Sequence, residues 1–106
     1  MVKYLSNNNL KDEISSGVFL VKFGASWCGP CKAIKPHFEK ASEENGHITF
    51  LDVSIEGENK NLVSEFQINS IPTFILFSDG KELGRRVGGQ AHLIGELLEL
   101  AQDYNL

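Results

Sequence analysis

Residues 18–32 read VFLVKFGASWCGPCK, and this stretch determines the fold that the chain is expected to adopt. Its beginning, Val18 to Phe23, is an apolar run interrupted by one lysine, which is typical of a strand buried on both faces. From Cys31 to Asn45 apolar residues recur at helical spacing, and Gly46 stands where a C-terminal helix cap belongs. The sequence therefore predicts a central strand that leads through a pair of cysteines into a helix.

Strands and helices are expected to alternate along the rest of the chain. Composition predicts further strands at Ile48 to Val53, Thr73 to Phe77 and Lys81 to Val87, with the turn sequence SDGK joining the last two as a hairpin. Helical spacing predicts short helices around Leu10 to Ile14 and Leu62 to Phe66, and a longer one from Leu93 to Tyr104. This order indicates an α/β fold with a central mixed β-sheet flanked by helices on both faces.

Length, composition and charge restrict the kind of protein. With 106 residues, of which 42% are hydrophobic, the chain suits one domain spanning residues 1–106. A net charge of −4 gives none of the broad attraction to phosphate that basic nucleic-acid binders show, so we expect no nucleic-acid partner. The sequence has no recognisable signal peptide or bilayer-spanning segment. We therefore expect a monomer in the reducing cytoplasm, with no membrane association.

The chain has two cysteines, separated only by Gly29 and Pro30. A bond between them would close a very small loop and add little stability through chain entropy. Paired cysteines in a reducing compartment usually bind a metal or exchange disulfides. A zinc module needs about four protein ligands, and His37, His47 and His92 are too far apart in sequence to supply the others. Redox chemistry is therefore favoured, and no metal is expected.

Cys28 stands at the start of the expected helix, where unpaired backbone N–H groups and the helix dipole favour an anion. The thiolate is the species that attacks a disulfide, so a lowered pKa of Cys28 would raise its reactivity near neutral pH. Lys32 and Lys35 add positive charge, and no acidic residue lies between Trp27 and Phe38. Cys31, one turn into the helix, is placed to attack the mixed disulfide that Cys28 would form with a substrate.

The segment WCGPCK at residues 27–32 is identical to the active-site sequence of thioredoxins, and the chain resembles that family over its whole length. Ile71-Pro72-Thr73 is similar to the family's cis-proline loop, so we expect a cis bond before Pro72. Val87-Gly88-Gly89 is similar to the glycine turn beside the family's substrate groove. The resemblance implies a thioredoxin fold and an enzyme that reduces protein disulfides.

The resemblance also implies roles for individual residues. Cys28 would be the nucleophile and Cys31 the resolving thiol, and together they would form the redox-active disulfide. The substrate groove would comprise Trp27, Gly29, Pro30, Ile71, Pro72 and Gly88. The partners would be disulfide-containing proteins and a thioredoxin reductase, with NADPH and FAD on that reductase and no cofactor bound to this chain.

Other interpretations of the same residues remain open. A non-catalytic binding module of this fold would not need both cysteines. An oxidising or isomerising relative usually carries other residues between the cysteines and works outside the cytosol. Trp27 could be a core aromatic, although its position between a strand end and the cysteines favours an exposed site residue.

Two charged residues depart from the family pattern. Thioredoxins commonly bury an aspartate where Lys22 stands, and many carry a lysine where Asp52 falls, so the charges are exchanged. In one interpretation Lys22 reaches water from a strand end while Asp52 meets solvent at the sheet edge. In the other, the two form a buried ion pair beneath the cysteines, which leaves neither charge alone in a low dielectric. In the family the buried acid accepts a proton from the resolving thiol, so both residues are candidates for proton transfer or pKa tuning.

Overall fold

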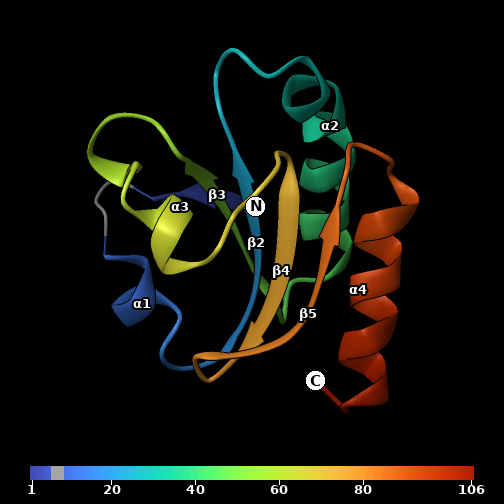
Figure 1. Cartoon of the computed structure of the whole chain (residues 1–106). Helices are drawn as coiled ribbons and strands as arrows, with labels where there is room; N and C mark the ends of the chain where they lie inside the picture. Colours follow the sequence, from blue (N-terminus) through green and yellow to red (C-terminus); the bar gives the residue numbers. More distant parts are fainter. Residues whose placement is uncertain (6–8) are drawn as a thin grey trace.

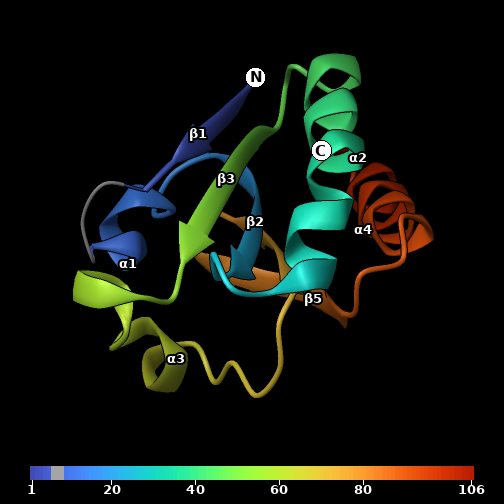
Figure 2. The same ribbon diagram turned by 90° about the horizontal axis from the view of Figure 1, so that it is seen from above.

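The central feature of the computed structural model is a five-stranded sheet with helices on both faces (Figure 1). Residues 1–5 and 9–106 are described. In chain order the elements are β1 (Val2–Tyr4), α1 (Leu10–Glu13), β2 (Val18–Gly24), α2 (Gly29–Glu44), β3 (Thr49–Ser54), the 3-10 turn η1 (Gly57–Asn59), α3 (Leu62–Glu65), β4 (Thr73–Ser78), β5 (Lys81–Val87) and α4 (His92–Asp103). Seen from above, α2 and α4 lie on one side of the sheet and α1 and α3 on the other (Figure 2). The predicted sheet between two helical layers is confirmed.

The strand order across the sheet is β1-β3-β2-β4-β5, which places β2 at the centre as predicted and leaves β1 and β5 at the edges. β2 pairs parallel with β3 and antiparallel with β4, so the sheet is mixed. Because β2 and β3 run parallel, their C-terminal ends meet at the same end of the sheet. The loops that follow these two strands therefore lie side by side, at the point where α2 begins.

Alternate residues of β2 face two separate apolar cores, one under each helical layer. Val21 and Phe23 pack with residues of α1 and α3, whereas Leu20 packs with residues of α2 and α4. All residues from Phe19 to Gly24 are buried, which explains why the run does not alternate between apolar and polar side chains. By the same alternation Lys22 lies on the face that α2 covers, where it interrupts the apolar pattern.

The helix after the cysteines differs slightly from its predicted bounds. It begins at Gly29, two residues early, because Pro30 fits a first helical turn, where its missing N–H is not needed. It ends at Glu44 with Asn45 as its C-cap, so the prediction of Gly46 as the cap is wrong. The Asn45 side-chain amide donates to a carbonyl oxygen of the last helical turn at 2.9 Å, which replaces a glycine cap.

Two elements, β1 and η1, have no counterpart in the sequence predictions. β1 buries only Val2, and it forms a strand because it pairs with β3, where Val2 lies opposite Phe50. The other strands and helices lie within a few residues of their predicted positions. Within residues 1–5 and 9–106, none of the helices combines the length and apolarity needed to cross a bilayer.

Candidate active site

Cys28 and Cys31 form a disulfide where β2 passes into α2. Cys28 is the N-cap residue of α2, with extended backbone angles, and its Sγ accepts a hydrogen bond from the Cys31 N–H at 3.2 Å. Both residues are buried, with exposed fractions of 6% for Cys28 and 2% for Cys31. A sulfur at this position faces the positive end of the helix dipole, which stabilises negative charge on it. The structure thus places Cys28, and not Cys31, at the N-cap of α2.

Trp27 and Ile71 flank the cysteines in different environments. Trp27 is 70% exposed, so the interpretation as a core aromatic is wrong. Ile71 is half-buried and packs against the apolar cluster that contains Cys28 and Cys31. The peptide bond between Ile71 and Pro72 is cis, as predicted. The loop before β4 is therefore brought against the disulfide, although the two lie far apart in sequence.

The glycine turn after β5 completes this side of the site. The Gly88 N–H donates to the Pro72 carbonyl oxygen at 2.9 Å, which fastens the turn to the proline loop. Gly88 has a φ of +132°, a conformation that side chains rarely adopt. A Cβ on Gly89 would lie 3.0 Å from the Cβ of Pro30, so the turn approaches the start of α2 closely. Gly29 is exposed, with open space where its Cβ would be.

Lys22 and Asp52 form an ion pair in which Lys22 is buried and Asp52 is half-buried. The Lys22 Nζ lies 3.0 Å from Asp52 Oδ2, and their side chains are only 6% and 14% exposed. The interpretation in which Lys22 reaches water is therefore wrong, whereas Asp52 keeps some exposure through the cavity beside it. A Cβ built on Gly24 would lie 3.1 Å from the Sγ of Cys31 and 3.9 Å from the Cε of Lys22. The pair thus lies behind the Cys31 sulfur, and Gly24, which has no side chain, lies between them.

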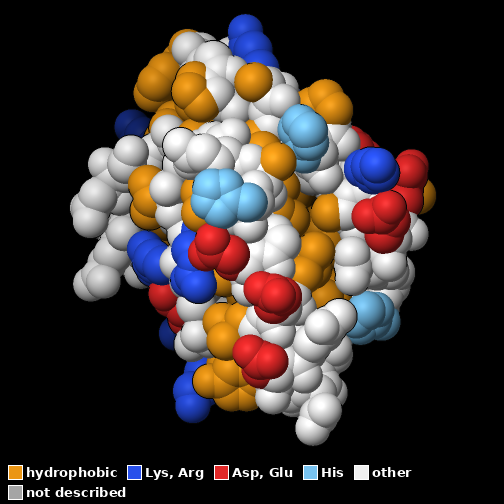
Figure 3. Space-filling view, turned by 90° about the vertical axis from the view of Figure 1, so that its right-hand side faces the viewer, with side chains coloured by type: hydrophobic (Ala, Val, Ile, Leu, Met, Phe, Trp, Pro, Cys, Tyr) orange, Lys and Arg blue, Asp and Glu red, His pale blue; other side chains and the backbone are white. Residues whose placement is uncertain are grey.

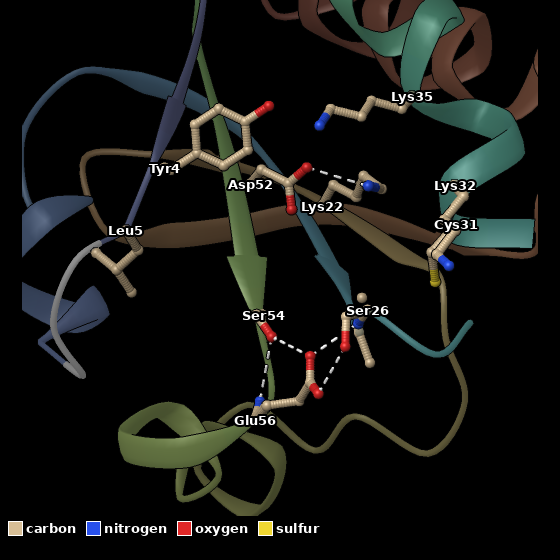
Figure 4. Close-up of a pocket in the computed structure, with 12 residues that line it drawn as sticks. Tyr4, Leu5, Lys22, Ser26, Cys31, Lys32, Lys35, Asp52, Ser54 and Glu56 are labelled. Atoms are coloured by element: carbon tan, nitrogen blue, oxygen red, sulfur yellow. Dashed lines mark hydrogen bonds and ion pairs between the residues drawn. The ribbon is translucent and has the colours of Figure 1, made fainter. Parts of the chain in front are cut away.

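A cavity of about 430 Å³ opens on this side of the disulfide, and Lys22, Asp52 and Cys31 all line it (Figure 4). Lys35 points across the cavity toward Tyr4 of β1, with its Nζ 5.4 Å from the centre of the tyrosine ring. A hydrogen bond with the Tyr4 hydroxyl raises the pKa of Lys35, and the charge of Asp52 adds to this effect. The positive charge of Lys35 therefore acts on the ion pair, and not on Cys28 alone.

Glu56 is a site residue for which the sequence carries no signal. It follows β3, and its carboxylate accepts hydrogen bonds from the backbone N–H and hydroxyl of Ser26 and from the hydroxyl of Ser54. These bonds, led by the Ser26 N–H, hold the pKa of Glu56 below its ordinary value. Glu56 thus connects the loop after β3 to the loop that carries the cysteines.

Comparison with known proteins identifies this arrangement. Residues 1–99 match the family model described as thioredoxin. The chain belongs to the thioredoxin family. Members of the thioredoxin family reduce protein disulfides, and the chain presents the family's cysteine pair, bonded together, at the start of a helix. It is a protein-disulfide reductase that works by dithiol-disulfide exchange.

Individual thioredoxins show how far the similarity extends. The chain is 44% identical over 88 residues to the thioredoxin of Chlamydia trachomatis serovar D, which covers 83% of this chain and 85% of that relative. It is 41% identical over 87 residues to the thioredoxin of Staphylococcus saprophyticus, and this match covers 81% of this chain and 83% of that relative. The solved structure of oxidised thioredoxin from Plasmodium falciparum gives a TM-score of 0.84 at 30% identity, and the match covers 93% of this chain and 96% of that one. The thioredoxin fold predicted from the sequence is confirmed.

Thioredoxins work without a bound cofactor, and metal ligation is the remaining alternative use of the cysteines. Within residues 1–5 and 9–106, no group of at least three His, Cys, Asp or Glu side chains could hold a metal ion. On the face that α4 covers, the histidine side chains are separated by other residues (Figure 3). The described part of the chain thus gives the zinc-module interpretation no support.

Proposed function

We propose that Cys28 is the attacking thiol and Cys31 the resolving thiol of this reductase. The observation that carries the proposal is the position of the Cys28 sulfur as the N-cap of α2, where it accepts the Cys31 N–H. The same position in the reduced protein stabilises a Cys28 thiolate more than a Cys31 thiolate.

The reaction then has two displacement steps. The Cys28 thiolate attacks one sulfur of the substrate disulfide, forms a mixed disulfide, and releases the other substrate sulfur as a thiolate that takes up a proton. Cys31 loses its proton and attacks the Cys28 sulfur, which forms the bond between Cys28 and Cys31 and releases the second substrate thiolate. Two electrons pass from the protein dithiol to the substrate, which leaves as a dithiol.

The substrate backbone is proposed to lie on the surface beside Cys28. The residues assigned to this groove are Trp27, Gly29, Pro30, Ile71, Pro72 and Gly88. The exposed indole of Trp27 and the packing of Ile71 against the cysteines support this assignment. The close approach of the glycine turn to Pro30 supports it as well, because glycines there leave room for a substrate backbone to come near.

The second step requires a base for the Cys31 thiol, and we assign this supporting role to the Lys22–Asp52 pair. Asp52 lines the same cavity as Cys31, which supports proton acceptance by its carboxylate through water in that cavity. Lys22 holds the carboxylate in place and puts a positive charge near the sulfur, which favours a Cys31 thiolate. A neutral Lys22 is the alternative base.

The electron donor is proposed to be a thioredoxin reductase that carries FAD and draws on NADPH. Family membership supports this partner and disulfide-bearing proteins as substrates. We further propose that residues 1–106 act as one domain and as a monomer in the cytoplasm, with no nucleic-acid partner, consistent with the net charge of −4.

Insulin reduction by dithiothreitol, with and without the protein, tests the activity. The protein should accelerate insulin precipitation, and Cys28→Ser should abolish the acceleration. Cys31→Ser should instead trap a mixed disulfide that mass spectrometry detects. Oxidation of NADPH in the presence of a matched reductase tests the donor. Failure of Cys31→Ser to accumulate a mixed disulfide, with Cys28→Ser still active, would reverse the roles of the two thiols.

A further inference from the structure

The segment that presents Cys28 is a single tight turn between β2 and α2. The Cys28 N–H donates to the Ala25 carbonyl oxygen at 3.2 Å, so Ser26 and Trp27 are the two central residues of this turn. The turn bond uses the N–H of Cys28 and the carbonyl of Ala25 only. The polar groups of Ser26 are therefore available for a contact outside the turn.

Glu56 makes that contact with both carboxylate oxygens. Its Oε1 accepts the Ser26 N–H at 2.7 Å, and its Oε2 accepts the Ser26 hydroxyl at 2.9 Å. The Ser54 hydroxyl donates to Oε1 at 2.9 Å from the other side (Figure 4). Hydrogen bonds to an ionised carboxylate are stronger than neutral ones, and two bonds to one residue also fix its orientation.

Glu56 itself stands on a firmly held segment. The neighbouring Ile55 donates its N–H to the Gly24 carbonyl oxygen at 2.9 Å, which attaches the segment to the end of β2. The Ile55 side chain packs against the cluster of Ala25, Cys28 and Cys31. The Glu56 carboxylate is thus a fixed point beside the turn, and its lowered pKa keeps it ionised into mildly acidic solution.

We propose that Glu56 is a positioning residue, which holds the turn through Ser26 and so keeps Trp27 and Cys28 in place for attack after the disulfide has opened. In the oxidised protein the bond between Cys28 and Cys31 also ties the turn to α2. Reduction removes that tie, so the hydrogen bonds of Ser26 to Glu56 matter most in the reactive, reduced form. This inference rests on the proposed roles of Cys28 and Cys31.

Positioning and simple electrostatics predict opposite results when Glu56 is replaced. If Glu56 acts through its charge, removing a nearby negative charge should make the Cys28 thiolate more favourable. If it acts by positioning, its loss should loosen the N-cap geometry and make that thiolate less favourable. The sign of the change therefore distinguishes the two.

The experiment compares Glu56→Ala, Glu56→Gln and Ser26→Ala in the reduced full-length protein, with Glu58→Ala as the control. Glu58 is an exposed glutamate two residues away. Iodoacetamide labelling of Cys28, followed by mass spectrometry across pH, gives the pH of half-maximal rate, and insulin reduction gives kcat/KM. Glu56→Ala should raise this pH by about half a unit and lower kcat/KM by about threefold to tenfold. Glu56→Gln keeps an oxygen that can accept the Ser26 N–H, and Ser26→Ala keeps that N–H. For both variants, the pH of half-maximal labelling and kcat/KM should lie between the values for Glu56→Ala and for the parent protein.

Other outcomes overturn the inference. If the pH of half-maximal Cys28 labelling is unchanged or lowered in Glu56→Ala, positioning is contradicted. It is also contradicted if Glu58→Ala raises this pH as much as Glu56→Ala does. If Glu56→Ala does not fold, the same comparison made with Ser26→Ala and Glu56→Gln decides the question. Failure of the parent protein to accelerate insulin reduction would instead count against the proposed function, whatever the variants do.

Discussion

Replacing Asp52 with asparagine should destabilise the protein by more than the loss of an exposed ion pair. The Lys22 ammonium would stay behind with a side chain 6% exposed and without the carboxylate that now lies 3.0 Å away. Removing one member of a buried pair lowers the free energy of unfolding by about 3–5 kcal/mol, whereas exposed pairs contribute about 0.2–1 kcal/mol. Asp52 is 14% exposed and lines a cavity, so water can reach the pair. We therefore expect a loss at or slightly below the lower end of the range for buried pairs, about 2–3 kcal/mol, for Asp52→Asn.

Lys22→Met should destabilise the protein less, by about 1–2 kcal/mol, because Asp52 is the more exposed partner and the charge of Lys35 also faces it. The double variant leaves neither charge alone. Its loss of unfolding free energy should therefore be about 2 kcal/mol smaller than the sum of the losses in the two single variants. Urea unfolding of the oxidised protein measures these free energies. The exposed pair of Arg86 and Glu96, with side chains 37% and 41% exposed, is the matched control. The coupling free energy between Arg86 and Glu96, obtained from the same comparison of single and double variants, should stay below about 1 kcal/mol.

Additive effects of Lys22→Met and Asp52→Asn, within about 0.5 kcal/mol, would refute the reasoning from burial. The same variants also test the proposed role in catalysis. If the pair assists deprotonation of Cys31, both variants should resolve the mixed disulfide more slowly, and that species should accumulate during insulin reduction. Unchanged turnover in both single variants would remove the pair from the mechanism while leaving its structural role intact.

Three further outcomes are expected. Iodoacetamide should label Cys28 before Cys31 in the reduced protein over the neutral pH range, because only the Cys28 sulfur caps a helix; faster labelling of Cys31 would contradict this. Gly88→Ala should lower kcat/KM for insulin by several-fold, because its φ of +132° does not suit a side chain; an unchanged rate would exclude the glycine turn from the site. Hydrogen bonds from Arg85 hold the pKa of Glu82 below its ordinary value of 4.5, so the pair stabilises the fold above that pH and loses this effect as pH falls through the lowered pKa. Glu82→Gln should therefore show a smaller fall in Tm on acidification than the parent protein, and an equal fall would contradict the assignment.

The features that the sequence could predict depend on local pattern. The apolar run before the cysteines and the helical spacing after them define β2 and α2 without reference to the rest of the chain. The charged residues Lys22 and Asp52 interrupt two apolar strands, which marks both as unusual. Their pairing required one more fact, the parallel register of β2 and β3 that sets them opposite each other. Once neighbouring strands are assumed, burial makes a pair the favoured arrangement.

The features that the sequence could not predict arise from contacts between distant segments. β1 is too short to show the alternation of apolar and polar side chains that marks a strand, so no pattern in the sequence indicates that Tyr4 lies near Lys35. Glu56 lies thirty residues from Ser26, and only the meeting of two strand ends brings their loops together. A lone glutamate in a loop is ordinarily a solvated surface residue, so its role becomes visible only with the hydrogen bonds in view.

The two edges of the sheet have a consequence for self-association. β5 carries charges at four of its seven positions, Lys81, Glu82, Arg85 and Arg86, and its pairing with β4 is interrupted by an irregularity. β1, at the other edge, is only three residues long. Short or charged edges with bulges resist strand addition and self-assembly into fibrils. Neither edge thus offers a long, regular strand to which a second polypeptide could add.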